Sequence, residues 1–203
     1  GDAIDDLKPL IQPGSSDSAA LDNVFEILVR AGRSAPMVKA MMIPEALNRL
    51  PKNNKAQRNF FNYLNAVMEP WDGPAALCMT DGRWVVAGMD RNGLRPMRTI
   101  TTSDGLLIVG SETGLVKIDE ATILHKGRVG PGQMIALDLQ EAKLYSEGEI
   151  RDYLSGQKAY DEWVTRITEI DSLVHTNAPE PTEFTDGELR RRQAAFGFDL
   201  EDM

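Results

Sequence analysis

One short stretch of the sequence places a carboxylate among small hydroxyl side chains, directly ahead of an apolar pattern with helical spacing. This stretch consists of Ser16, Asp17 and Ser18. Asp17 could accept hydrogen bonds from the first amides of the following helix, as N-cap residues do. The same carboxylate could instead bind the ammonium group of a ligand through a charge-assisted hydrogen bond. The residues alone leave both interpretations open, a helix cap and a cation-binding site.

A second stretch, residues 88–96, combines charged side chains with residues that restrict the backbone. It holds Asp90, Arg91 and Arg95, and a glycine and a proline flank them. Because a guanidinium group pairs rigidly with a carboxylate, this stretch could be an ion-paired corner that supports a site. It could equally be a solvated loop between two strands. The sequence does not decide between these two interpretations.

Other kinds of site find little support. The two histidines, His125 and His175, lie far apart in the sequence without a cysteine or carboxylate at ligand spacing, so no metal site is predicted. There is no glycine-rich phosphate loop after a strand. Cys78 lies in an apolar run and is interpreted as a residue of a core strand without a catalytic role.

The composition narrows the function classes. A formal net charge of -9 repels phosphates and anionic lipids, which argues against a nucleic-acid partner. No apolar run reaches the roughly 18 residues that a membrane span needs, so no membrane contact is expected. The chain has 1 cysteine and therefore no intramolecular disulfide, which indicates a reducing compartment and predicts a cytoplasmic protein.

Hydrophobic periodicity predicts the elements that position these residues. Helices are expected over 18–31 and 55–68, and the segment 37–47 should be only partly helical because Pro44 interrupts it. Strands are expected over 75–79, 83–89, 97–101, 106–109, 114–118 and 134–138, the first two forming a hairpin. Helical spacing returns after Ser146, continues through Trp163, Ile167 and Ile170, and is seen again over 188–196. Helices, a run of strands and helices again predict an α+β domain.

Several longer motifs resemble the large chain of glutamate synthase, in the later part of its class II glutamine amidotransferase domain. They occur in the order and spacing of that family and are Ser16–Glu26, Glu69–Ala76, Asp90–Pro96, Gly110–Gly114 and Arg191–Gly197. The resemblance implies part of a four-layer αββα N-terminal-nucleophile hydrolase sandwich with flanking helices. It also implies that residues 1–173 are the later part of the glutaminase domain, and that 174–203 are a linker and the start of a central domain.

The family's reaction implies what the chain should bind. In that family an N-terminal cysteine hydrolyses glutamine to glutamate and ammonia, and the ammonia is channelled to a site with FMN and an iron-sulfur cluster that converts 2-oxoglutarate to glutamate. Electrons come from an electron-donor subunit using a nicotinamide nucleotide or from ferredoxin. The family's nucleophile and oxyanion residues precede the matched region, and Gly1 cannot replace the cysteine. No residue of this chain is therefore expected to be catalytic, and no cofactor is expected to bind it.

The resemblance assigns one substrate contact. Asp17 is expected to receive the α-ammonium group of glutamine, and further residues of the matching motifs are expected to support the site: Ser16, Ser18, Asp90, Arg91, Arg95 and Glu112. The remainder of the same large chain is an expected partner. Both ends of the sequence look cut, so the chain is interpreted as a fragment that is inactive when isolated.

Two alternatives stay open on the sequence. The chain could be a non-catalytic structural or interaction module. It could also belong to another class II amidotransferase, such as the enzyme of purine synthesis, which shares the Ser-acid and Gly-x-Arg-Pro themes. The stretches Trp71–Pro74 and Ala19–Asp22 resemble glutamate synthase more closely.

Overall fold

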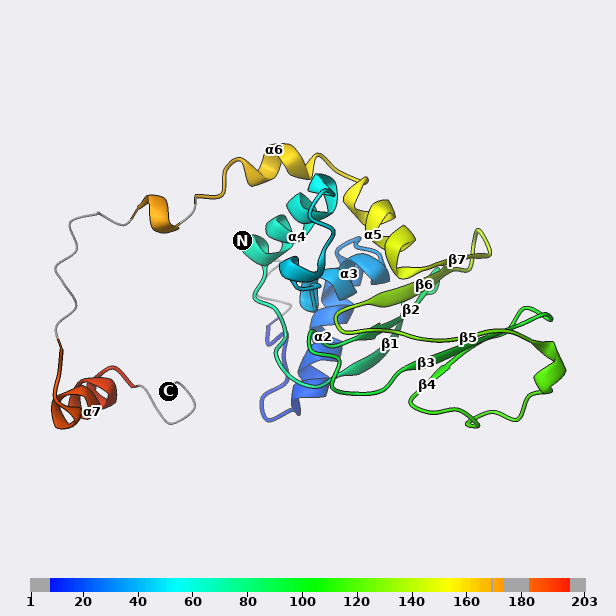
Figure 1. Cartoon of the computed structure of the whole chain (residues 1–203), viewed down its shortest axis with the longest axis horizontal. Helices are drawn as coiled ribbons and strands as arrows, with labels where there is room; N and C mark the ends of the chain where they lie inside the picture. The colour runs from blue at the N-terminus through cyan, green and yellow to red at the C-terminus, as the bar shows by residue number, and fades with distance from the viewer. Residues whose placement is uncertain (1–7, 169, 174–182, 198–203) are drawn as a thin grey trace. The chain divides into compact units, whose positions relative to one another are not determined.

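The computed structural model of the chain describes residues 8–168, 170–173 and 183–197 (Figure 1). Two compact units make up the chain, residues 1–167 and residues 168–203. The first unit combines helices with two antiparallel sheets, which confirms the predicted α+β class. No helix among the described residues is long and apolar enough to cross a membrane.

The helices before the sheets form where the apolar periodicity predicted them. Helix α2 spans Asp17–Arg30 and α4 spans Lys55–Val67, each within one residue of the expected bounds. Helix α3, Ala35–Met42, ends two residues before Pro44, because the residue before a proline avoids helical geometry. A 3-10 turn, η1, follows at Leu47–Arg49. The interrupted segment 37–47 is therefore partly helical, as expected.

A four-stranded antiparallel sheet has the order β1-β2-β6-β7. Its strands are β1 Ala76–Thr80, β2 Trp84–Met89, β6 Met134–Asp138 and β7 Lys143–Tyr145. The hairpin of β1 and β2 is confirmed, with Cys78 opposite Ala87. Strand β6 lies where the sequence predicted it, whereas the three-residue β7 was missed because it is too short to show a period.

A three-stranded antiparallel sheet has the order β4-β3-β5. Its strands are β3 Arg98–Thr102, β4 Leu107–Gly110 and β5 Ile123–Arg128, with a 3-10 turn η2 at Glu120–Thr122. The prediction of a strand over 114–118 is wrong: these residues lie in the β4–η2 connection, and Gly114 has a φ of 90°. Strand β5 was missed because its charged residues hide any apolar alternation.

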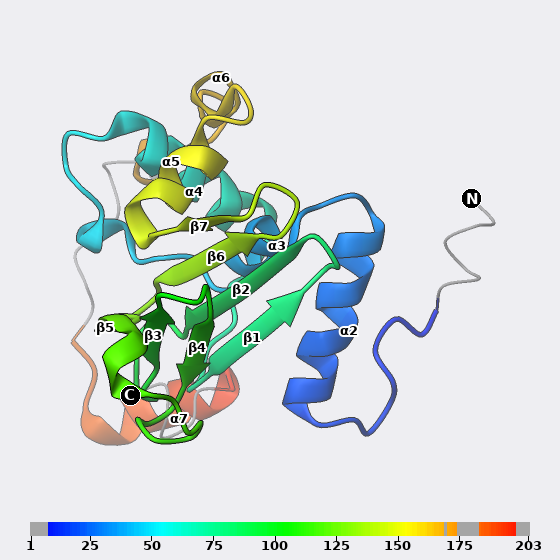
Figure 2. The same ribbon diagram turned by 90° about the vertical axis from the view of Figure 1, so that its right-hand side faces the viewer.

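Helices α3, α4 and α5 lie on one side of the four-stranded sheet (Figure 2). Helix α5 spans Glu147–Ser155 and contacts β6, while α3 contacts β2. The side chains of Trp84 and Val86 on β2 and of Ala136 on β6 are buried in the resulting core. This core holds β2 in place, and β2 leads directly into the loop at residues 90–96.

Cys78 departs from its predicted environment. Cys78 lies in a strand, as expected, but it is exposed to solvent. The interpretation of Cys78 as a buried core residue is therefore wrong. Successive strand residues point to opposite faces, and Met79 takes the buried position beside it. Cys78 and its partner Ala87 therefore belong to the sheet face opposite the helices.

The later helices are shorter than the sequence suggested. Helix α6 spans only Tyr160–Val164, so Ile167 and Ile170 do not extend it as their spacing predicted. In the second unit, η3 spans Ile170–Ser172 and α7 spans Asp186–Ala195, which confirms the helix expected at 188–196. Residues 174–182 of the predicted linker, including His175, lie outside the described residues.

Candidate functional site

The start of α2 separates the two roles that the sequence left open for Asp17. Ser16 is the N-cap residue, and its Oγ accepts a hydrogen bond of 3.3 Å from the backbone N–H of Ala19. The Ser16 and Ser18 hydroxyls lie 3.1 Å apart. Asp17 is the first residue of the helix instead of its cap. The interpretation of Asp17 as an N-cap is therefore wrong, and Ser16 performs that task.

The Asp17 carboxylate is exposed. Within the part of the chain that the structure describes, it makes no hydrogen bond and no ion pair. A negative charge in the first turn of a helix is favourable, since the helix dipole places partial positive charge there. Asp17 is thus held by a capped helix end while its oxygens remain able to accept hydrogen bonds from a cation.

A cavity of about 420 Å³ lies beside this helix end. It is lined by Ser18 from α2, by Trp71 from the loop before β1, by Arg95 and by Ser111. Four segments distant in sequence therefore meet at one cavity. Of the predicted residues, Ser18 and Arg95 line it, and the structure does not bring the others to its wall. Asp17 and Glu112 are each adjacent in sequence to a lining residue.

Asp90 organises the loop that carries Arg95. Its carboxylate is buried, and Oδ1 accepts hydrogen bonds from the backbone N–H groups of Asn92, Gly93 and Leu94 at 2.9, 2.7 and 3.4 Å. Its Oδ2 accepts from Ala75 N–H at 3.1 Å, which ties the loop to the start of β1. Burial alone would raise the pKa of this carboxyl, but the four backbone donors together lower it below its usual value.

The 90–96 loop is therefore held by hydrogen bonds to backbone amides and not by ion pairs. Asp90 binds backbone amides, and neither Arg91 nor Arg95 forms a salt bridge within the described residues. Both arginines are exposed, as is Glu112 beyond β4. The sequence-based idea of an ion-paired corner is wrong in its chemistry, since the carboxylate is satisfied by N–H groups.

A buried lysine near the loop was missed by sequence reasoning. Lys39 on α3 is 1% exposed, and its Nζ donates to the carbonyl oxygens of Gly132 at 2.6 Å and Ile43 at 3.2 Å. Gly132 N–H in turn donates to the Asp90 carbonyl oxygen at 2.6 Å. Burial lowers the pKa of Lys39 to about 7, and the charges of Glu45 and Asp90 oppose that shift only in part. Its one sequence signal was a single charge inside an apolar run.

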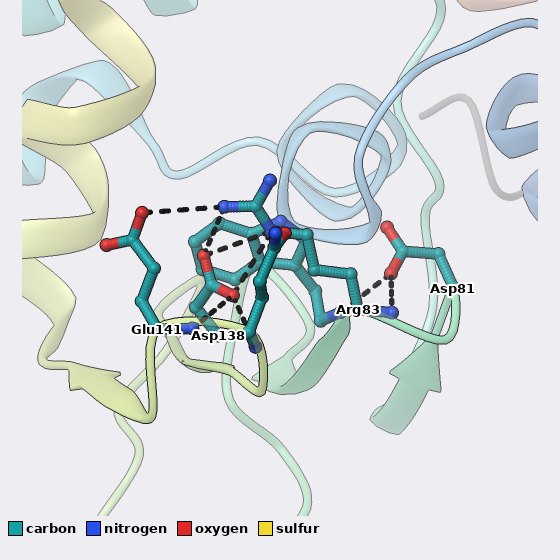
Figure 3. A network of polar contacts seen from close by, with 6 residues as sticks. Asp81, Arg83, Asp138 and Glu141 are labelled. Carbon is teal, nitrogen blue, oxygen red and sulfur yellow. Dashed lines mark hydrogen bonds and ion pairs between the residues drawn. The ribbon is translucent and has the colours of Figure 1, made fainter.

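A second polar cluster lies at the hairpin end of the sheet (Figure 3). The Arg83 guanidinium binds the buried Asp138 carboxylate, with Nη2 at 2.6 Å and Nε at 3.1 Å from Oδ2. Glu141 lies 3.8 Å from the same guanidinium. Asp81 accepts from Trp84 N–H at 2.7 Å and from Ala35 N–H at 2.8 Å. None of these residues lines the cavity, and they fix the hairpin turn against α3.

Substitution of Gly93 should show how tightly the loop is held. Gly93 has a φ of 66°, and a Cβ there would lie 2.9 Å from the Cα atom of Pro131. We expect Gly93→Ala to lower the free energy of unfolding by about 2–4 kcal/mol, from the left-handed backbone plus overpacking. The measurement is urea-dependent proteolysis of the full-length protein, read on peptides from β2 and the loop.

Gly82→Ala is the matched control for this substitution. Gly82 has a φ of 89°, but a Cβ there would meet nothing within 4 Å. It should therefore show only the backbone cost of about 1–2 kcal/mol. Equal losses in the two variants would mean that the contact between the loop and Pro131 is not close.

Comparison with known proteins identifies relatives of the whole chain. The family model described as glutamine amidotransferases class-II matches residues 1–163. The chain is 58% identical to a "Glutamate synthase [NADPH] large chain" of Azospirillum brasilense over an alignment of 208 positions. It is 36% identical to the protein of the same name from Bacillus subtilis, and 40% identical to "Ferredoxin-dependent glutamate synthase 2" of a Synechocystis strain.

These relatives are much longer than the chain. The alignments cover 100%, 100% and 97% of it, but only 14%, 13% and 13% of the three relatives. The matched family model spans both sheets and helices α2 to α5. The cavity, Asp17 and the Asp90 loop therefore all lie within the matched residues.

Proposed function

Because this chain belongs to the class II glutamine amidotransferases, we propose that it forms part of the glutamine-hydrolysing domain of a glutamate synthase. In this proposal the full-length protein hydrolyses glutamine to glutamate and ammonia, and the ammonia is channelled to a second site where 2-oxoglutarate becomes glutamate. The relatives named as NADPH or ferredoxin glutamate synthases support it. The chain contributes substrate binding, and its nucleophile lies elsewhere in the full-length protein.

The observation that carries the proposal is that the Asp17 carboxylate is exposed and unpaired among the described residues. Its carboxylate stands exposed at a helix end that Ser16 already caps. It can thus accept the α-ammonium of glutamine without giving up any interaction with the described residues. Ser16 and Ser18 restrict the first turn, while Asp90 holds the loop with Arg95, so these residues support the site without touching the reacting amide. Arg91 and Glu112 are proposed as outer support.

We infer a second sheet layer from the face opposite the helices. On that face Val85 is 37% and Leu144 is 38% exposed, and Cys78 is exposed as well. A sheet normally buries at least one face against another layer, and apolar residues on the second face favour a further partner. A stacked sheet from the rest of the glutaminase domain would cover them, giving the four-layer αββα arrangement. The domain limits 1–173 and 174–203 remain part of this proposal.

The iron-sulfur cluster of the proposed enzyme does not fit this chain. Iron-sulfur clusters are held by several cysteine thiolates, and the sequence contains only Cys78. The cluster would therefore belong to another segment of the full-length protein, and we propose that FMN binds outside this chain as well. Electrons would come from a nicotinamide-dependent subunit or from ferredoxin, since relatives of both kinds match. A cytoplasmic location is proposed from the single cysteine.

The proposal is tested by comparing the 203-residue chain with the full-length protein. With glutamine as the only substrate, we expect the full-length protein to release glutamate and ammonia in equal amounts. The isolated chain should release none, because the attacking thiolate is supplied by another segment. Ammonia is measured with a coupled assay and glutamate by chromatography. A full-length protein that leaves glutamine intact would overturn the proposed function and favour a structural module.

A further inference from the structure

An open groove of about 610 Å³ is lined by the connection between β2 and β3 and by the connection between β5 and β6. Three of its lining residues are arginines. These are Arg95, Arg98 at the start of β3, and Arg128 at the end of β5. The remaining lining residues are uncharged and include Met97 and Pro131. All three arginines are exposed. The groove is thus a concentrated positive surface on a chain whose formal net charge is -9.

The placement of two of these arginines is unfavourable in the chain as it stands. Arg98 and Arg128 are directly opposite each other in the ladder between β3 and β5. Like charges at such positions repel, because the Cβ atoms of facing residues lie only about 4.5–5.5 Å apart. None of the three arginines forms a salt bridge within the described residues. If both guanidinium groups bound one carboxylate of a partner, its negative charge would offset the repulsion between them.

We propose that this groove binds an acidic segment of the remainder of the full-length protein. The guanidinium group is planar and pairs with carboxylates through two parallel hydrogen bonds, so Arg98 and Arg128 can bind one carboxylate from two sides. This inference rests on the proposed function only in treating the chain as one segment of a longer protein. The relatives supply the reason, since the chain covers 14% of the length of the Azospirillum protein.

The surroundings favour a polypeptide over a small anion. The groove is several times larger than one inorganic phosphate needs, and Pro96 and Pro131 contribute apolar surface to it. The same three-stranded sheet and its loops expose further apolar side chains, all more than half exposed: Leu106, Leu115, Val116 and Leu124. Such a combination of apolar and charged surface is typical of interfaces between protein segments.

The experiment uses the full-length protein carrying Arg128→Lys, which keeps the positive charge and introduces a reactive amine. A carbodiimide joins this amine to a carboxylate only when the two are in contact. We expect an amide cross-link, identified by peptide mass spectrometry, from position 128 to an Asp or Glu outside the 203-residue segment. Adding Arg98→Gln, which removes the second guanidinium group without placing a carboxylate opposite position 128, should reduce the yield of this cross-link at least fivefold.

Arg49→Lys is the control, because Arg49 is exposed on η1, far in sequence from the groove, and should yield no such cross-link. Cross-links from position 128 only to carboxylates within the segment, to a second protein, or to none would overturn the inference. Glutamine hydrolysis is measured on the same Arg128→Lys sample. If hydrolysis persists without the cross-link, the groove assignment fails alone; if the cross-link forms without hydrolysis, the proposed function fails alone.

Discussion

Replacing Asp17 by asparagine in the full-length protein should raise the Michaelis constant for glutamine about tenfold or more. The substitution keeps the size of the side chain and its place in the first turn of α2, but removes the charge that would pair with the α-ammonium group. A charge-assisted hydrogen bond contributes about 1.5–3 kcal/mol, which corresponds to about 10- to 150-fold in binding. The turnover number should change less, because the ammonium group is remote from the reacting amide.

The chain offers a closely matched control in α7. Asp186 is the first residue of that helix and follows the cap Thr185, just as Asp17 follows Ser16. Asp186→Asn therefore removes the same charge from the same position of a helix, and should change the Michaelis constant less than twofold. The measurement is the Michaelis constant for glutamine in steady-state glutaminase kinetics of both variants. An unchanged Michaelis constant in Asp17→Asn would remove this residue from the site.

Local sequence signals were sufficient for the elements that have a clear period or turn. The hairpin of β1 and β2, helix α4 and strand β6 all appeared where the pattern predicted them. The predicted strand over 114–118 failed because an apolar stretch specifies a strand only when a neighbouring strand is available to pair. Strand β5 shows the converse, since pairing with β3 forms it despite its charged residues.

The site was less accessible to sequence reasoning than the fold. Spacing could not show that Ser16, and not Asp17, caps α2, because both residue types are good caps. Nor could it show that Asp90 binds four backbone amides, since these come from two separate segments. The cavity depends on α2, Trp71, Arg95 and Ser111 meeting in space. The residues alone raised Asp17 as a helix cap or a cation-binding group, and only the resemblance to a family assigned it to the α-ammonium group of glutamine.

Lys39 gives the second large expected effect, a dependence of stability on pH. In the folded chain its Nζ is buried and donates to two carbonyl oxygens, which the two N–H groups of a neutral amine can satisfy. The nearby Glu45 is already paired with Arg151 at 2.8 Å, so it does not serve as a dedicated counter-ion for Lys39. Burial therefore outweighs the remaining attraction, and the pKa falls from its usual 10.5 to about 7.

The sign of the effect follows from which state binds the proton. Between pH 7 and 10.5 the unfolded chain holds a proton on Lys39 that the folded chain has lost. The free energy of unfolding should thus rise with pH across this window, by up to about 1.4 kcal/mol per pH unit, and become flat below about pH 7. Lys39→Met removes the titrating group. The free energy of unfolding of this variant should therefore lack the pH-dependent contribution of Lys39.

The measurement is urea-dependent proteolysis of the full-length protein at pH 7, 8 and 9, read on peptides from α3 and β2. Taking the difference between the native chain and Lys39→Met cancels the titration of all other groups. Lys55→Met is the control, because Lys55 is exposed at the start of α4 and should leave the slope unchanged. If the native chain and Lys39→Met differ by the same free energy at all three pH values, Lys39 is charged in the fold. Its contacts with Gly132 and Ile43 would then be charge-assisted hydrogen bonds, and the charges of Glu45 and Asp90 would compensate the buried ammonium group.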